Sequence, residues 1–246
     1  MTRFSWVRVS GAVLLVALLA ALLMLVPSWQ LSPATVLASG AENVPIGQII
    51  FVGDSLTAGS QATDPYPSQI MRKFDPGVRW QNLGVGGMRI KDMLDLAPAR
   101  VDLRYNSRLG RNVVVVWGGT NDVALWNHMA GTVYHRIREF CLERRQQGFT
   151  VLVLTMLPRN DKICQLGFEE RRQAINRRLR LSWSDFADGI VDVAADPRIG
   201  TAGCENDYRY WVQGGVHLTN KGLSIVATDV RKALITLENP VVQAAD

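Results

Sequence analysis

Short runs of hydrophobic residues alternate with longer amphipathic stretches along most of this chain. The short runs predict five β-strands, at Gln48–Val52, Arg79–Leu83, Asn112–Trp117, Phe149–Thr155 and Ile190–Val193. The third of them contains four consecutive valines. A continuous apolar run of this kind is typical of a strand that is buried on both faces of a parallel sheet.

The longer stretches carry hydrophobic residues at helical spacing. They predict helices over 66–74, 90–105, 131–147, 168–186 and 219–237. We expect Pro98 to interrupt the second helix and Thr219 to cap the last one. Strands that alternate with helices predict an α/β fold, here a three-layer α/β/α sandwich around a five-stranded parallel sheet.

The start of the chain has a different pattern. An uncharged hydrophobic run, Val9–Val26, follows Arg3 and Arg8, which is the order found in export signals and membrane anchors. As a helix this run spans about 27 Å, close to the ~30 Å hydrocarbon core of a bilayer. The site that suits a signal peptidase, Val36-Leu37-Ala38, lies twelve residues beyond Val26, which is far from the run. We therefore favour an uncleaved transmembrane anchor over a cleaved signal peptide.

This reading divides the chain into three parts. Residues 1–26 form the anchor or signal peptide, residues 27–46 form a linker with several Pro and Ser, and residues 47–246 form the folded domain. Because positive charge stays on the cytoplasmic side, an anchored domain faces the periplasm or cell exterior. Cleavage of the segment would instead release a secreted protein.

Composition and charge exclude several classes of protein. The chain has 246 residues, of which 48% are hydrophobic and 20% charged, so it is neither disordered nor of low complexity. The net charge is +5, and the part without Arg3 and Arg8 has 25 − 22 = +3, which is too little to indicate a nucleic-acid partner. The three histidines form no HExxH motif, and we expect no metal or cofactor.

The three cysteines are Cys141, Cys164 and Cys204, and they form no CxxC motif. Cys141 lies on the apolar face of a predicted helix, where we expect it to behave as a small buried hydrophobe. The other two fall in predicted loops. Because disulfides form outside the cytoplasm, we predict that Cys164 and Cys204 pair.

Candidate chemistry gathers at the ends of the predicted strands. Gly53–Gly59 follows the first strand and contains Ser55. Asn82–Gly87 follows the second strand, Gly118–Asp122 follows the third, and Gly214–Thr219 precedes the last helix. In a parallel α/β sheet, ligands bind at the carboxyl ends of the strands, so we expect these segments to meet.

Together, the four segments resemble those of the SGNH/GDSL hydrolase family over about residues 49–236. The resemblance implies a flavodoxin-like fold and a serine esterase with Ser55 as nucleophile and His217 as general base. It also implies an oxyanion hole in which the backbone N–H of Ser55, the backbone N–H of Gly84 and the side-chain amide of Asn121 donate hydrogen bonds. The chemistry agrees, because serine is a poor nucleophile unless a base takes its proton and each oxyanion donor contributes about 2.7–4 kcal/mol.

Each of these residues also has a simpler interpretation. Ser55 could be a turn residue, Gly84 could be a strand-end glycine with positive φ, Asn121 could cap the following helix, and His217 could be a surface histidine. Asp54 is predicted to form hydrogen bonds in the turn rather than to take part in catalysis.

One position departs from the family pattern. The family carries an aspartate three residues before the histidine, and this chain has Gly214 there. Another carboxylate could replace it, from Asp192, Glu205 or Asp207. Alternatively, a backbone carbonyl near Gly214 could accept the Nδ1 proton, or the protein could be inactive. Loss of the orienting acid costs up to about 10⁴ in kcat in a Ser-His-Asp enzyme.

The sequence thus predicts an extracytoplasmic serine esterase that hydrolyses acyl esters, with small-molecule, glycan or lipid esters as substrates and the membrane as partner through the N-terminal helix. No long apolar insertion separates the strands, which favours acetyl or other short acyl groups. Two alternatives remain: an O-acyltransferase or deacetylase of envelope polysaccharide on the same scaffold, and a catalytically impaired binding domain.

Overall fold

The computed structural model describes residues 44–238. The predicted anchor or signal segment and nearly all of the predicted linker lie outside the described residues. Ile46, the last residue of that linker, already begins the first strand. No helix between residues 44 and 238 is long and apolar enough to cross a membrane.

Five parallel strands form one sheet, as the sequence predicts. They are β1 (Ile46–Gly53), β2 (Arg79–Asn82), β3 (Arg111–Trp117), β4 (Thr150–Leu154) and β5 (Gly189–Val191). Their order is β2-β1-β3-β4-β5. In register, Ile50 of β1 lies between Gln81 of β2 and Val114 of β3. The strands with the clearest hydrophobic runs, β1, β3 and β4, form the centre of the sheet, where side chains are buried on both faces.

Seven α-helices connect or follow these strands in the described part of the chain. They are α2 (Ser55–Ala58), α3 (Tyr66–Met71), α4 (Ile90–Arg100), α5 (Thr120–Ala124), α6 (Ala130–Gln146), α7 (Phe168–Ser182) and α8 (Asn220–Glu238). Short 3₁₀ turns lie at Asp102–Arg104, Ser107–Leu109, Trp183–Asp185, Val193–Ala195 and Cys204–Asn206.

The structure corrects one detail of the predicted helices and confirms another. The expected interruption at Pro98 is wrong, because α4 continues through this residue to Arg100 before a 3₁₀ turn follows. The predicted cap on the last helix is confirmed, since the Gly222 N–H donates to Thr219 Oγ1 at 3.2 Å. The short helices α2 and α5 were not predicted as separate elements.

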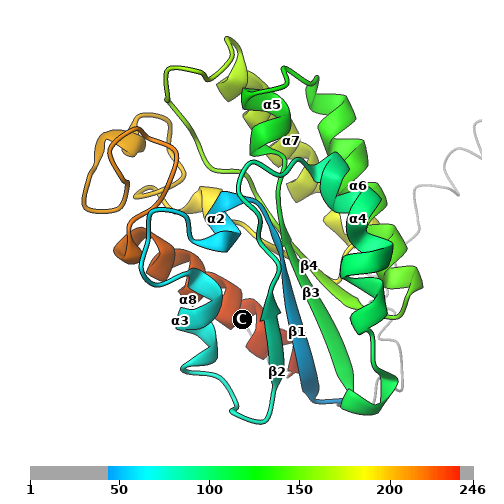
Figure 1. Ribbon diagram of the computed structural model, residues 1–246. Coiled ribbons are helices and arrows are strands. Elements are labelled where there is room, and N and C mark those ends of the chain that lie inside the picture. Colours follow the sequence, from blue (N-terminus) through cyan, green and yellow to red (C-terminus); the bar gives the residue numbers. More distant parts are fainter. Residues whose placement is uncertain (1–43, 239–246) are drawn as a thin grey trace, which may run out of the picture. The chain divides into compact units, whose positions relative to one another are not determined.

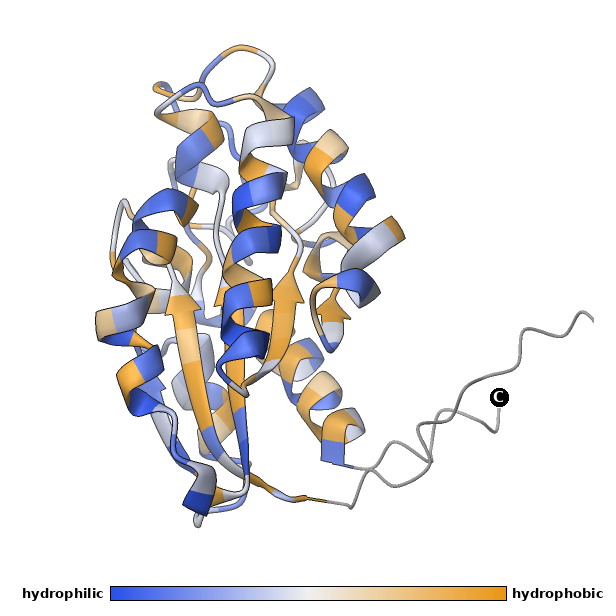
Figure 2. Cartoon of the chain, turned by 90° about the vertical axis from the view of Figure 1, so that its right-hand side faces the viewer, coloured by the Kyte–Doolittle hydropathy of each residue, from blue (hydrophilic) through white to orange (hydrophobic). Residues whose placement is uncertain are grey.

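The helices cover both faces of the sheet (Figure 1). Ile49 and Phe51 point into a core shared with α3 and α8, whereas Ile50 and Val52 point into a second core shared with α4, α6 and α7. This division follows from the two-residue period of a strand. Figure 2 shows the hydrophobic strands between helices that carry both hydrophobic and polar residues.

The structure tests both cysteine predictions. Cys141 is fully buried in the second core, as expected. The predicted disulfide is wrong, because Cys164 and Cys204 are both free thiols. Cys204 packs against the first core and Cys164 against the second, so the two lie on opposite faces of the sheet.

The strand order reverses at one place in the sheet, next to β1. The chain leaves β1 toward β2 on one side, and β3 then pairs with β1 on the other side. Open α/β sheets bind ligands where the strand order reverses in this way, outside the carboxyl ends of the strands. Helix α2 directly follows β1 and helix α5 follows β3, so both begin at this point (Figure 1).

Candidate active site

Ser55 is the first residue of α2, in a tight turn at the end of β1. The turn is fixed by Asp54, whose Oδ1 accepts the Leu56 N–H at 2.9 Å, as expected of a turn residue. Burial raises the pKa of the Asp54 carboxyl to about 7. A side chain at Gly53 would lie 2.1 Å from Thr57 Oγ1, so only glycine lets α2 fold back this closely onto the strand.

His217 approaches Ser55 from the loop between β5 and α8. Its Nε2 lies 2.9 Å from Ser55 Oγ, although 162 positions separate the two residues in sequence. Burial lowers the pKa of His217, the positive charge of Arg159 lowers it further, and Asp161 opposes the shift. The imidazole is therefore neutral at pH 7, which is the form that can accept a proton from the serine hydroxyl.

The other ring nitrogen of His217 contacts a residue that sequence analysis did not consider. Nδ1 lies 2.8 Å from Oε1 of Gln61, in the loop that follows α2. Gly214, at the position of the family's aspartate, has a φ of 109° and nothing within 4 Å of where a Cβ would stand. Within residues 44–238 the ring nitrogens contact Gln61 and Ser55 and make no hydrogen bond to a backbone carbonyl near Gly214, so this expectation is not supported.

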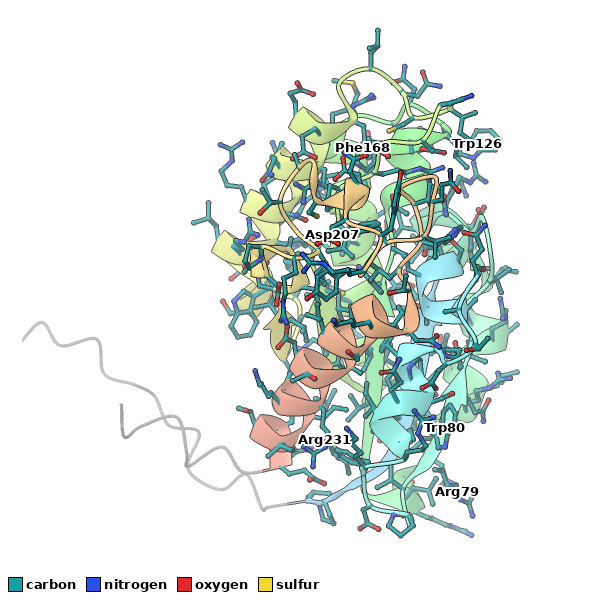
Figure 3. All side chains as sticks on the ribbon, turned by 90° about the vertical axis from the view of Figure 1, so that its left-hand side faces the viewer. Arg79, Trp80, Trp126, Phe168, Asp207 and Arg231 are labelled. Atoms are coloured by element: carbon teal, nitrogen blue, oxygen red, sulfur yellow. The ribbon has the colours of Figure 1, made fainter. Side chains whose placement is uncertain are left out.

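The three predicted substitutes for the missing acid have other partners. Asp192 accepts hydrogen bonds from Arg180 and from the Thr155 hydroxyl. Glu205 Oε2 accepts the N–H of Gly203 at 2.8 Å. Asp207, labelled on the loop between β5 and α8 in Figure 3, pairs with Arg209 at 2.6 Å.

Gly84 lies against the backbone of α2. A Cβ at this position would stand 2.3 Å from the nitrogen of Ala58, so the close approach requires glycine. Positive φ is not the reason, because Gly84 is absent from the glycines with a left-handed backbone among residues 44–238. Its N–H donates to Oδ1 of Asn82 at 2.9 Å. This donor therefore already has a partner, which an oxyanion would have to replace.

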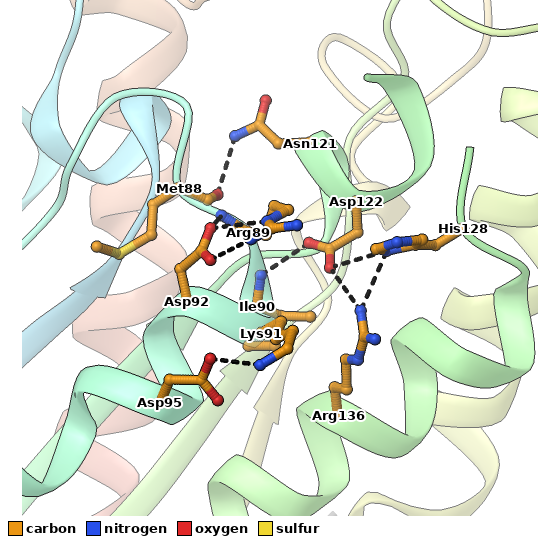
Figure 4. Close-up of polar contacts among 10 residues, drawn as sticks. All are labelled: Met88, Arg89, Ile90, Lys91, Asp92, Asp95, Asn121, Asp122, His128 and Arg136. Carbon is orange, nitrogen blue, oxygen red and sulfur yellow. Dashed lines mark hydrogen bonds and ion pairs between the residues drawn. The ribbon is translucent and has the colours of Figure 1, made fainter. Parts of the chain in front are cut away.

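Asn121 is the second residue of α5 and is held at both ends of its amide. Its Nδ2 donates to the carbonyl of Met88 at 3.0 Å (Figure 4). Its Oδ1 accepts from Nη1 of Arg159 at 3.3 Å. Asn121 does not cap the helix, since the N-cap position belongs to Gly119. One hydrogen of Nδ2 remains for a further acceptor.

The neighbouring Asp122 anchors the start of α4 to α5. Its buried Oδ2 accepts the Ile90 N–H at 2.7 Å, and Oδ1 lies 3.5 Å from His128 Nδ1 and 3.6 Å from Arg136 Nη1 (Figure 4). Burial raises the pKa of this carboxyl. These contacts hold the loop after β2, with Met88, close to the Asn121 amide.

The structure therefore brings Ser55 and His217 into hydrogen-bond contact and places Gly84 against the helix that carries Ser55. A serine hydroxyl beside a neutral imidazole, at the carboxyl end of a parallel sheet, is the arrangement that α/β serine hydrolases use for acyl transfer. The catalytic roles of Ser55 and His217 and the oxyanion roles of Gly84 and Asn121 stay predictions.

Comparison with known proteins identifies the family. Residues 51–224 match the GDSL-like Lipase/Acylhydrolase family, and the chain belongs to it. No curated protein sequence is similar enough to count as a match.

Solved structures share the fold at low identity. A member of the lipolytic protein G-D-S-L family from Veillonella parvula is 18% identical, with a TM-score of 0.60 over 75% of this chain and 96% of that chain. The psychrotrophic esterase EstA from Pseudoalteromonas sp. is 11% identical, with a TM-score of 0.62 over 78% and 99%. Axe2, an acetylxylan esterase from Geobacillus stearothermophilus, is 17% identical, with a TM-score of 0.55 over 78% and 96%.

Two residues of the site, Arg159 and Gln61, were not predicted from the sequence. Arg159 follows the fourth strand, so its place at a strand end was a usable signal. Gln61 gave none, because glutamine is outside the usual set of orienting acids and its loop conformation cannot be read from the residue types around it.

Proposed function

We propose that this protein is a serine esterase that hydrolyses short-chain acyl esters through an acyl-enzyme at Ser55. The observation that carries the proposal is the 2.9 Å contact between Ser55 Oγ and His217 Nε2 in a chain of the GDSL family. The lowered pKa of His217 supports it, because the base is then free of its proton at neutral pH.

In the proposed reaction, Ser55 Oγ attacks the acyl carbon while His217 Nε2 takes the hydroxyl proton. The tetrahedral intermediate collapses as the same imidazole returns that proton to the leaving alcohol. A water molecule then attacks the acyl-enzyme, again with His217 as base. Its proton passes to Ser55 Oγ, and the carboxylic acid leaves.

The negative charge on the carbonyl oxygen would be met by the N–H groups of Ser55 and Gly84 and by Nδ2 of Asn121. For Gly84, the oxyanion would replace Asn82 Oδ1, the neutral acceptor that now holds this N–H. Hydrogen bonds to a charged acceptor are about twice as strong as those to a neutral one, so the exchange favours the transition state. For Asn121, the second Nδ2 hydrogen would serve while the first stays on Met88.

The loops of the domain favour acetyl and other short acyl groups as substrates. The segments after β4 and β5 are the longest loops of the domain, and neither is a long apolar lid of the kind that covers a fatty acyl chain. Axe2, which shares the fold, is an acetylxylan esterase. An acetylated carbohydrate is accordingly the substrate class we propose.

We also propose that the domain works outside the cytoplasm, held to the membrane by the N-terminal helix. Support comes from the sequence alone, in the order of Arg3, Arg8 and the uncharged run Val9–Val26. Intact mass of the membrane-extracted protein tests this, because cleavage after residue 38 would remove the whole run.

The direct test is turnover of p-nitrophenyl acetate, butyrate and octanoate by the full chain purified in detergent. We expect the acetate to react fastest and Ser55→Ala to abolish turnover. Ser107→Ala is the matched control, because Ser107 is exposed in the 3₁₀ turn that precedes β3, at the opposite end of the sheet. Equal rates for wild type and Ser55→Ala would contradict the proposal. Turnover only in the presence of an acceptor sugar would show an acyltransferase instead.

A further inference from the structure

We infer that Gln61 is the positioning residue of this site, and that its side-chain amide oxygen takes the place of the carboxylate that orients the histidine in related hydrolases. The inference rests on the proposed function, in which His217 must present an unprotonated Nε2 to Ser55. It makes the site a Ser-His-Gln arrangement with an uncharged third member.

Hydrogen-bond chemistry links Gln61 to the tautomer of His217. An amide oxygen can only accept, so Oε1 at 2.8 Å from Nδ1 requires the ring proton to be on Nδ1. Nε2 then carries the lone pair and accepts the Ser55 hydroxyl at 2.9 Å. The opposite amide orientation would present an N–H to Nδ1 and leave the ring proton on Nε2, where it would meet the hydroxyl and prevent proton transfer.

The backbone at Gln61 is a second, independent observation. Its φ is 64°, and only Gln61 and Asn127 among the non-glycine residues of 44–238 have a left-handed backbone. The turn around it is fixed by hydrogen bonds from the N–H groups of Gly59 and Ser60 to the Ser55 carbonyl and from Ala62 to the Gly59 carbonyl. Glycine would adopt this conformation without strain, so a glutamine here carries a conformational cost.

The position of the usual acid cannot serve the same purpose. Gly214 has a φ of 109°, which an aspartate rarely adopts, and its Cβ direction is open. Asp192, Glu205 and Asp207 are engaged elsewhere. Within the described part of the chain, Gln61 is therefore the residue that contacts Nδ1.

The charge of the side chain at position 61 affects the pKa of His217, which can be measured. The charged groups that act on the imidazole are Arg159, which disfavours the imidazolium, and Asp161, which favours it. An amide adds no charge to this balance, whereas a carboxylate at the same place would stabilise the imidazolium. Gln61→Glu should thus raise the pKa of His217 by about one unit, since the contact is exposed to solvent and lies at the low end of such shifts.

The experiment reads His217 directly. Nitrogen NMR of the full chain, with ¹⁵N-labelled histidine and substitutions of His128 and His135 for assignment, reports the tautomer and pKa of each ring. We expect the Nδ1–H tautomer in wild type, the same tautomer with a raised pKa in Gln61→Glu, and a mixture of tautomers in Gln61→Gly. Gln146→Glu, an exposed glutamine at the end of α6, is the matched control and should change nothing.

Activity and stability complete the test. In Gln61→Gly we expect kcat for p-nitrophenyl acetate to fall about tenfold, the value of one lost hydrogen bond, with KM little changed. The unfolding temperature should hold or rise, because glycine relieves the left-handed backbone. In Gln61→Glu the acid limb of kcat/KM should move to higher pH with the measured pKa of His217.

An Nε2–H tautomer in wild type, or a His217 that neither variant alters, would overturn the inference. Because the NMR readout needs no turnover, that result is distinct from failure of the proposed function, which would show as no hydrolysis by wild type.

Discussion

The fit between Gly84 and α2 makes the substitution Gly84→Ala an informative perturbation. The new Cβ would stand 2.3 Å from Ala58 N and 2.7 Å from the carbonyl carbon of Thr57. Comfortable contacts are about 3.5 Å or longer, so the loop and helix must separate by about 1 Å. Overpacking of this kind costs about 1–3 kcal/mol, and each kcal/mol lowers the unfolding temperature by about 2–4 °C in a domain of this size.

The same shift moves the Ser55 hydroxyl and the Gly84 N–H apart. A misplacement of about 1 Å lowers turnover by about a hundredfold. We expect both effects in Gly84→Ala, measured by urea unfolding and by kcat/KM with p-nitrophenyl acetate.

Gly86→Ala is the matched control for this prediction. It lies in the same loop, and the nearest atom to its Cβ is Ser60 Oγ at 4.0 Å. We expect it to stay near wild type in both measurements. If Gly84→Ala and Gly86→Ala behaved alike, the loop would not lie against α2 as described and the reasoning would be refuted.

Three further predictions follow from the site. Because burial raises the pKa of Asp54 to about 7, the unfolding free energy should fall as pH rises from about 4 to 7. Asp54→Asn should remove this fall, because asparagine is uncharged but can still accept the Leu56 N–H. The same dependence of stability on pH in the variant would contradict the prediction. Because burial and Arg159 lower the pKa of His217, kcat/KM should fall on the acid side only below about pH 6.5. In Arg159→Gln this fall should begin at a higher pH. A wild-type kcat/KM that already falls above pH 6.5 would contradict this prediction. Gly214→Asp should lower stability by about 1 kcal/mol or more without increasing kcat, and a gain in kcat would show that the loop can place the acid after all.

Much of the fold was predictable, because hydrophobic periodicity records burial. The four valines of β3 and the apolar runs of β1 and β4 predicted the centre of the sheet, and the alternation with helices predicted parallel strands. The short helices α2 and α5 escaped prediction because helices of four and five residues show no periodicity. The helix continues through Pro98, against the prediction, because the packing of α4 on the sheet and α6 outweighs one lost backbone hydrogen bond.

The site was predictable to the extent that its chemistry uses characteristic residue types. Ser55 and His217 stand in glycine-rich segments at strand and helix ends, and the structure brings them together. What contacts Nδ1 depended on a left-handed turn at Gln61, which no local pattern signals. The disulfide failed for a related reason, since Cys164 and Cys204 are both in loops but on opposite faces of the sheet.

The central claim is that Ser55 is a nucleophile activated by His217. Its most direct test is the reaction of the full chain with a fluorophosphonate, followed by intact mass and peptide mapping. The account predicts one adduct per chain, located on Ser55, absent in Ser55→Ala and formed much more slowly in His217→Ala. An unmodified wild-type chain, or an adduct on another residue, would contradict it.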